Sequence, residues 1–227
     1  MIGCREKSLL ELLDAMIEKY HLLKHPFDRA WSQGKLTKES LKLCAEQYYQ
    51  HVREFPGNLK RLAGRTNGSL QELMKENLAE ERDPSVPHPM LWRQFAQSLG
   101  VSEAALDAAR PLPGIAALLD LYDEVRAKGS LAQAVAAFHA YEAQVPELAA
   151  QKISGLQRFH GIAEPRALAY FAVHKEADMR HRTAGRKWLQ DQEDVDAVAV
   201  LCAAERSLKA LWGALDAVYL PACPASH

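Results

Sequence analysis

Two histidines and an aspartate share one face of a helical segment in the last third of the chain. His174, Asp178 and His181 are spaced by four and three residues, which places them on one side of an α-helix. Tyr170 and Trp188 lie on the same side, so we expect that side to be buried. A buried polar group without a partner costs roughly 2–7 kcal/mol, and more when it is ionised. A metal ion would satisfy all three side chains, because imidazole and carboxylate are common ligands of transition metals.

Further polar side chains stand where the helical pattern predicts an apolar residue. Glu81 ends one apolar stripe and Glu142 interrupts another, while Lys152 lies on an inward stripe beyond Pro146. His88 follows Glu81 by seven residues, in a proline-rich segment that we expect to be a loop. Three carboxylates and three imidazoles exceed a closed zinc site and suit two iron or manganese ions with open positions. The sequence therefore predicts a dinuclear centre whose ligands are Glu81, His88, Glu142, His174, Asp178 and His181.

Each predicted ligand also has a purely structural interpretation. A lone buried histidine such as His88 is more often hydrogen-bonded than metal-bound, and Glu81 could be a surface carboxylate at a helix end. Glu142 could pair with a buried cation, although buried ion pairs are rare. We expect several other aromatic and imidazole side chains to serve core packing or the surface: Tyr48, Tyr49, Trp92, His21, His25, His51, His139, His160 and His227.

Helical periodicity runs through the whole chain, and no alternating strand pattern accompanies it. We expect helices over residues 8–23, 37–62, 69–81, 91–99, 115–127, 129–159, 165–188 and 195–215, separated by proline and glycine clusters. Pro56 and Pro146 are expected to kink the helices that contain them. This pattern predicts an all-α bundle of seven or eight helices, forming a single domain over residues 1–227 with a frayed tail at 221–227.

The composition narrows the function classes. The 227 residues are 48% hydrophobic and 25% charged with a net charge of −1, and interleaved charges of both signs favour neither nucleic acid nor an anionic membrane as a partner. Four cysteines without a CxxC pair argue against a disulfide scaffold. No apolar run approaches the ~18 residues of a membrane span, and the N-terminal residues do not resemble a signal peptide. We therefore expect a cytoplasmic protein.

Longer motifs resemble the TenA/PqqC-like group of proteins over nearly the whole chain. They include His25-Pro26-Phe27, Gln47-Tyr48-Tyr49-Gln50-His51, Asn77-Leu78-Ala79-Glu80-Glu81, Leu91-Trp92-Arg93-Gln94-Phe95, Tyr141-Glu142-Ala143-Gln144-Val145-Pro146-Glu147 and His174-Lys175-Glu176-Ala177-Asp178-Met179-Arg180-His181. Within that group, the chain is most similar to the branch that includes the Chlamydia protein associating with death domains and its bacterial relatives. The resemblance implies a heme-oxygenase-like helical fold that binds no heme.

The resemblance also implies a cofactor. In the heme-oxygenase-like diiron oxidases six ligands hold two metal ions, Fe/Fe or Fe/Mn, and the matching positions are the six isolated above. Members of this branch take electrons from a donor and use dioxygen as a co-substrate. A homodimer is expected from the family. The family's metal-free alternative, TenA- or PqqC-like chemistry on a small heterocycle, would have the same six residues line an organic pocket, and an interaction protein would need none of them.

The branch also suggests a reaction. Its members resemble one another in making para-aminobenzoate for folate synthesis from their own side chains, with a tyrosine supplying the ring and a lysine the amino group. Lys152 matches that lysine, and Tyr141 matches a tyrosine beside a ligand. The chain departs from the pattern at two tyrosine positions, which here are Asp28 and Cys44. Another tyrosine must then supply the ring, from among Tyr20, Tyr48, Tyr49 and Tyr141.

Alternatively, the substrate is an external small molecule. Relatives in the wider superfamily oxidise free amino acids or fatty acids. Asp28 would then bind a substrate ammonium group and Lys152 a substrate carboxylate, since opposite charges pair strongly in a partly dry pocket.

Overall fold

The computed structural model describes residues 7–85 and 87–219, with the side chains of residues 176–182 left outside that description. In this part of the chain all regular structure is helical. The elements are α1 (Leu9–Lys19), η1 (Leu22–Lys24), α2 (Pro26–Ser32), α3 (Lys38–Ala63), α4 (Gly68–Glu81), α5 (His88–Ser98), α6 (Glu103–Ala108), α7 (Pro113–Lys128), α8 (Leu131–Glu142), α9 (Val145–Phe159), α10 (Pro165–Gln190) and α11 (Ala197–Val218).

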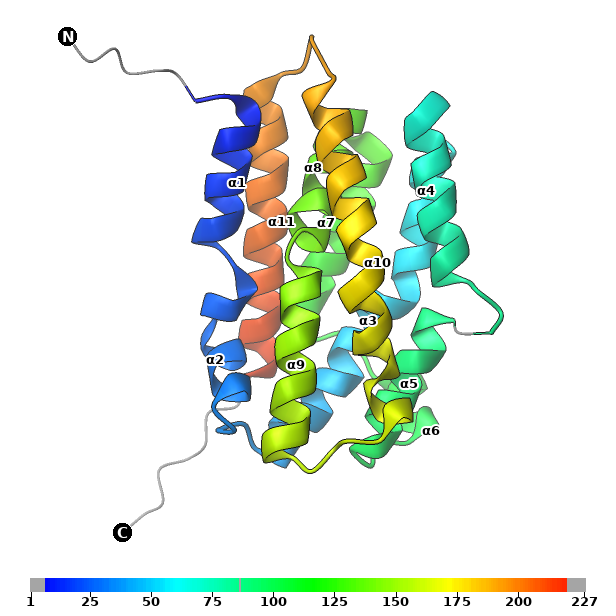
Figure 1. Cartoon of the computed structure of the whole chain (residues 1–227), viewed down its shortest axis with the longest axis vertical. Helices are drawn as coiled ribbons and strands as arrows, with labels where there is room; N and C mark the ends of the chain where they lie inside the picture. Colours follow the sequence, from blue (N-terminus) through cyan, green and yellow to red (C-terminus); the bar gives the residue numbers. More distant parts are fainter. Residues whose placement is uncertain (1–6, 86, 220–227) are drawn as a thin grey trace, which may run out of the picture.

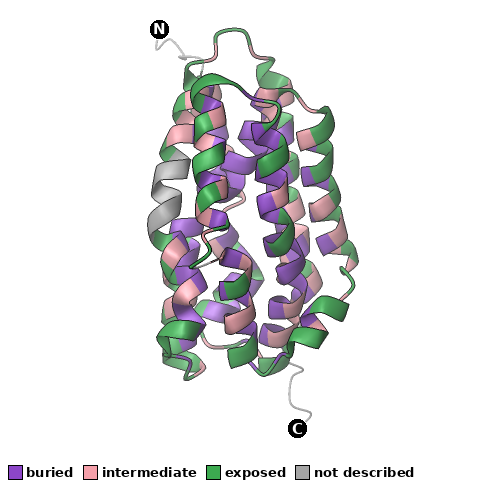
Figure 2. Ribbon diagram, turned by 90° about the vertical axis from the view of Figure 1, so that its right-hand side faces the viewer, coloured by how far each residue is buried: buried purple, intermediate pink, exposed green. Residues whose placement is uncertain are grey.

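The long helices run along the long axis of the molecule (Figure 1). Helix α11 packs against α7 and α8, α10 packs against α5, α8 and α9, and α3 packs against α4, α5 and α7. Buried residues face the interior of this bundle and exposed residues face outward (Figure 2). Within the described ranges, no helix has the length and the apolar composition that a membrane span requires.

The predicted all-α class is confirmed, although the described residues form more helices than the seven or eight expected. One difference is α2, where the sequence indicated only a break at His25-Pro26-Phe27. Pro26 occupies the first turn of α2, where its missing N–H costs no hydrogen bond, and the His25 side chain caps that turn by accepting from the backbone N–H of Phe27 at 3.0 Å. Helix α2 carries Asp28.

The prediction that His88 lies in a loop was wrong. His88 is the first residue of α5, and Pro89 follows it within the first turn. The prolines that indicated a loop in fact start a helix, because proline is favoured in a first turn and disfavoured later.

Proline also divides the long helix expected over residues 129–159. The chain forms α8 and α9 there, with Ala143 and Gln144 between them and Pro146 in the first turn of α9. The buried Gln144 side chain accepts from the backbone N–H of Leu22 at 2.7 Å and donates to the carbonyl of Ala140 at 2.7 Å. This break fixes the directions of α8, which ends at Glu142, and of α9, which carries Lys152.

Helix α9 approaches α2 closely at Gly155. A Cβ atom at this position would lie 2.4 Å from Cδ1 and 2.6 Å from Nε1 of the Trp31 indole. The same indole donates a hydrogen bond to the carbonyl of Lys152 at 3.2 Å. Gly155 therefore allows Trp31 to hold the turn of α9 that carries Lys152.

We expect Gly155→Ala to lower the free energy of unfolding by about 1–3 kcal/mol, because the added methyl group displaces a buried indole. Urea denaturation measures this change. Gly57→Ala is the matched control, since a Cβ atom at Gly57 in α3 meets nothing within 4 Å. That change should be neutral or add about 0.5–1 kcal/mol. Equal stability of the two variants would contradict the close packing of α2 and α9.

Candidate metal centre

Three of the predicted ligands meet at one point in the bundle. Glu81 is the last residue of α4, His88 the first of α5, and His174 lies in the middle of α10. Their ligand atoms lie within 4.8 Å of one another, and the side chains are 6%, 6% and 7% exposed. Nδ1 of His88 is 3.0 Å and Nε2 of His174 is 3.9 Å from Oε1 of Glu81. The close approach of three buried ligands from three helices is typical of a metal site.

The hydrogen bonds of this cluster leave lone pairs free for a metal. Nδ1 of His174 lies 2.7 Å from the carbonyl oxygen of Tyr170, which only accepts, so this nitrogen carries the proton and Nε2 presents its lone pair to Glu81. Such a backbone contact orients histidine ligands in many metal sites. Nδ1 of His88 is buried and has no hydrogen-bond partner despite its proximity to Glu81. These donors fit a transition metal, with Glu81, His88 and His174 as the residues that would hold it.

Glu142 lies beside this cluster at the end of α8. Its Oε1 accepts a hydrogen bond of 3.0 Å from the side-chain amide of Asn77 on α4. Glu81, Glu142 and His174 line one small cavity of about 10 Å³, which we call the inner cavity. That volume is room for roughly one water-sized ligand. The position of Glu142 is compatible with its predicted role as one of the six ligands of a dinuclear centre.

Two predicted ligands fall outside the description. Asp178 and His181 belong to α10, but their side chains are among those left outside the described residues. The six-ligand dinuclear centre therefore stays a prediction, of which four residues are placed together.

The residues predicted to bind or transform the substrate line a second cavity of about 90 Å³, the outer cavity. Asp28, Cys44, Tyr141 and Lys152 all contribute to its walls. His174 lines both cavities, so a ligand in the outer cavity lies directly beside the metal cluster. The remaining walls are apolar and aromatic, and they come from Leu22, Phe27, Tyr48, Trp92, Val145, Leu148, Ala149, Tyr170, Phe171 and Leu215.

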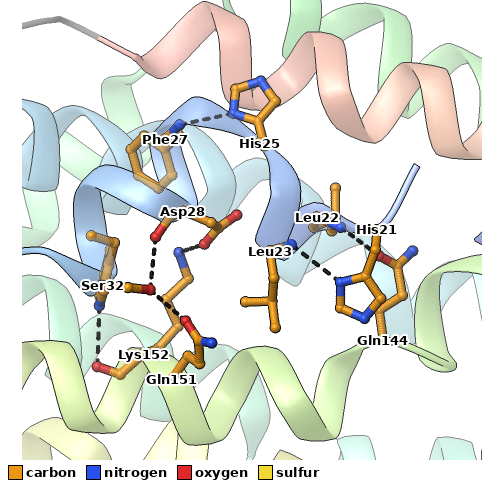
Figure 3. A network of polar contacts seen from close by, with 11 residues as sticks. His21, Leu22, Leu23, His25, Phe27, Asp28, Ser32, Gln144, Gln151 and Lys152 are labelled. Atoms are coloured by element: carbon orange, nitrogen blue, oxygen red, sulfur yellow. Dashed lines mark hydrogen bonds and ion pairs between the residues drawn. The ribbon is translucent and has the colours of Figure 1, made fainter. Parts of the chain in front are cut away.

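An ion pair occupies one side of the outer cavity. Figure 3 shows Asp28 on α2 and Lys152 on α9 pointing toward each other, and the Lys152 ammonium binds the Asp28 carboxylate. The ammonium also lies 3.9 Å from the ring centroid of Trp31 and 4.8 Å from that of Phe27. The Lys152 side chain thus contacts one carboxylate and two aromatic faces.

Burial favours the neutral form of two other side chains that line the outer cavity, Cys44 and Tyr48. Burial raises the pKa of the Cys44 thiol to about 12, so it is not a thiolate nucleophile at neutral pH. Burial also raises the pKa of the Tyr48 phenol, which donates a hydrogen bond of 2.8 Å to the Tyr141 hydroxyl. The sequence predicted either core packing or a role as the ring source for Tyr48, and the structure places it in the cavity with Tyr141.

The fold and the buried Glu–His–His cluster define a helical protein that can hold a metal beside an enclosed organic pocket. Residues 42–212 match the family described as "Iron-containing redox enzyme". The chain belongs to this family and is an enzyme.

Curated relatives match nearly the full length. The chain is 37% identical to the 4-aminobenzoate synthase of Chlamydia muridarum, over 97% of this chain and 94% of the relative. It is 36% identical to the 4-aminobenzoate synthase of Nitrosomonas europaea, over 93% of this chain and 91% of the relative.

Solved structures show the same fold. A TenA homolog from Pseudomonas syringae pv. tomato superposes with a TM-score of 0.78 at 16% identity, covering 92% of this chain and 90% of that one. A CADD-like protein of unknown function from Nostoc punctiforme gives 0.73 at 14% identity, covering 92% and 96%. The expected heme-oxygenase-like (TenA/PqqC-like) architecture is therefore confirmed.

Loss of one ligand from the cluster should weaken metal binding. For His88→Ala and His174→Ala we expect at least about a tenfold loss of iron affinity, because each removes an imidazole nitrogen from a buried site. Iron and manganese bound per chain, measured by mass spectrometry after growth with both metals, check this. His160→Ala is the control, since His160 caps α9 and lines neither cavity. Unchanged metal content in both cluster variants would contradict the site.

Proposed function

We propose that this protein is a 4-aminobenzoate synthase that works as a dioxygen-dependent, dinuclear metal oxygenase with Fe/Fe or Fe/Mn and without heme. The observation that carries the proposal is that His174 belongs both to the metal cluster and to the cavity that holds Lys152 and Tyr141. The relatives at 36–37% identity carry that enzyme's name. We further propose that it acts in the cytoplasm as a homodimer, with an electron donor as its redox partner.

The metal ions would supply the oxidation by dioxygen, which side chains alone cannot perform. The chain's own residues supply position and exclusion of water. Asp28, Phe27 and Trp31 hold the Lys152 ammonium at the wall of the outer cavity. The lining beside it is mostly apolar and aromatic, so few polar groups other than Asp28 are offered to the lysine nitrogen within the cavity.

The outer cavity also selects among the tyrosines that could supply an aromatic ring. Of the four that the sequence offered, Tyr48 and Tyr141 line the cavity. Tyr20 instead donates to Glu205 and packs edge-on against Trp212, and Tyr49 lies under the Arg93 guanidinium. If the ring comes from the protein, we propose Tyr48 or Tyr141 as its source.

Complementation of a para-aminobenzoate auxotroph tests this function. We expect the wild-type chain to restore growth and Lys152→Arg to abolish it, because guanidinium keeps the charge but cannot supply a primary amine. One of Tyr48→Phe and Tyr141→Phe should also fail, whereas Tyr20→Phe should grow. Protein levels on immunoblots control for folding. Full growth with both Lys152→Arg and His174→Ala would contradict the proposed chemistry and favour a metal-free or binding role.

A second candidate function is oxidation of an external amino acid or fatty acid. It is favoured by one specific observation, the placement of opposite charges from Asp28 and Lys152 at one side of an otherwise apolar cavity. A zwitterion can exchange with that ion pair, its ammonium on Asp28 and its carboxylate on Lys152. A fatty acid would use Lys152 alone.

Asp28→Asn separates these two functions. For an external amino acid we expect at least about a tenfold loss in binding, because the variant leaves the substrate ammonium without its charged partner. Calorimetric titration of aromatic and aliphatic amino acids into the protein measures this. A wild-type chain that binds no amino acid, but restores growth of the auxotroph, would exclude the external substrate.

A further inference from the structure

Near the metal cluster, His51 has two buried ring nitrogens without hydrogen-bond partners. It lies on α3 and is 1% exposed, yet neither Nδ1 nor Nε2 has a hydrogen-bond partner within the described part of the chain. Buried polar atoms in native proteins nearly always have a partner, in the protein or in a bound ligand. We therefore expect a bound ligand, and not a surrounding side chain, to form a hydrogen bond with this ring.

The surroundings of His51 do not explain why the residue is a histidine. Its ring contacts the rings of Tyr48, Phe55, Tyr122 and Tyr141, with centroid separations between 5.2 and 5.7 Å. A phenylalanine would make equivalent contacts without two unpaired nitrogens. Burial alone lowers the His51 pKa to about 4, so at neutral pH the ring is uncharged, with one N–H donor and one acceptor nitrogen.

His51 can contact a ligand in the inner cavity. It lines the inner cavity together with Glu81, Glu142 and His174. It is not part of the group of ligand atoms that lie within 4.8 Å of one another, so it is set back from the cluster. A cavity with room for one water-sized ligand lies beside both.

We propose that His51 is a positioning residue that donates a hydrogen bond to a water-sized ligand held in the inner cavity against the metal centre. The ligand class is a small molecule or anion with an oxygen or fluoride acceptor, such as water, hydroxide or fluoride. The inference rests on the proposed metal centre and adds to it a residue that is not itself a ligand. Val52 and Phe55 of the same helix close the cavity with apolar surface, which strengthens this hydrogen bond.

Fluoride binding to the iron(III)-loaded protein tests the proposal, because fluoride has the size of a water oxygen and only accepts hydrogen bonds. We expect His51→Leu to raise the fluoride dissociation constant about tenfold, the effect of losing one hydrogen bond to an anion. His51→Gln retains an N–H donor and should stay within about threefold of the wild type. His160→Gln is the control for loss of a histidine elsewhere. Absorption and electron paramagnetic resonance of the iron follow the titration.

Metal content, measured on the same samples, separates the possible failures. A wild-type chain that takes up no metal overturns the proposed function and this inference together. Metal uptake with a fluoride affinity that is the same in His51→Leu and the wild type overturns this inference alone.

A second measurement observes the His51 N–H directly in the wild-type chain and uses a substitution only to assign its signal. In zinc(II)-loaded protein with ring-¹⁵N histidine, we expect the His51 N–H to shift and to exchange more slowly with solvent than in the metal-free protein. His51→Gln, which folds with a polar side chain of similar length, assigns the resonance. An N–H signal that is indifferent to zinc overturns the proposal.

Discussion

The structure depends on one constraint, the burial of a carboxylate and two imidazoles at the meeting point of α4, α5 and α10. All three side chains are buried and Nδ1 of His88 has no hydrogen-bond partner, and such a group is costly to bury unless a ligand satisfies it. The three helices bring these side chains together at one point. Helices α4 and α5 contribute ligands at their termini, where no further turn of helix obstructs the cluster. On α10, the Tyr170 carbonyl accepts from Nδ1 of His174 and so fixes which ring nitrogen carries the proton.

His174 then connects binding to chemistry. Its side chain lines both the inner cavity and the outer one, so a metal held by the cluster would lie beside a molecule in the outer cavity. The Tyr170 ring packs against the His174 ring, and the Trp92 ring packs edge-on against Tyr170, so aromatic surface lies at that boundary. One face of α10 therefore contributes both a predicted metal ligand, His174, and part of the wall of the outer cavity.

Periodicity predicted much of this arrangement. A carboxylate on an apolar stripe has few explanations, so Glu81 and Glu142 could be identified from the sequence. The order of helices also followed from local signals, and Ser8 and Thr37 cap the N-termini of α1 and α3. Local signals failed at proline, because this residue can either interrupt a helix or occupy its first turn. Pro26 and Pro89 start helices here, and the sequence alone indicated a break and a loop. His51 could not be identified, because an inward histidine looks the same in a sequence whether or not it has a partner.

The contact between Asp28 and Lys152 could not be predicted either, since 124 residues separate the two. This ion pair constrains both candidate functions. Breaking a buried pair by removing one partner costs about 3–5 kcal/mol, so the ammonium leaves Asp28 only when another group takes its place or its proton is transferred. An external amino acid replaces both charges at once. A reaction of Lys152 itself needs a nitrogen lone pair, and the nearest proton acceptor is the Asp28 carboxylate. Under either proposed function, Asp28 is the side chain that Lys152 must leave before it reacts or binds a substrate.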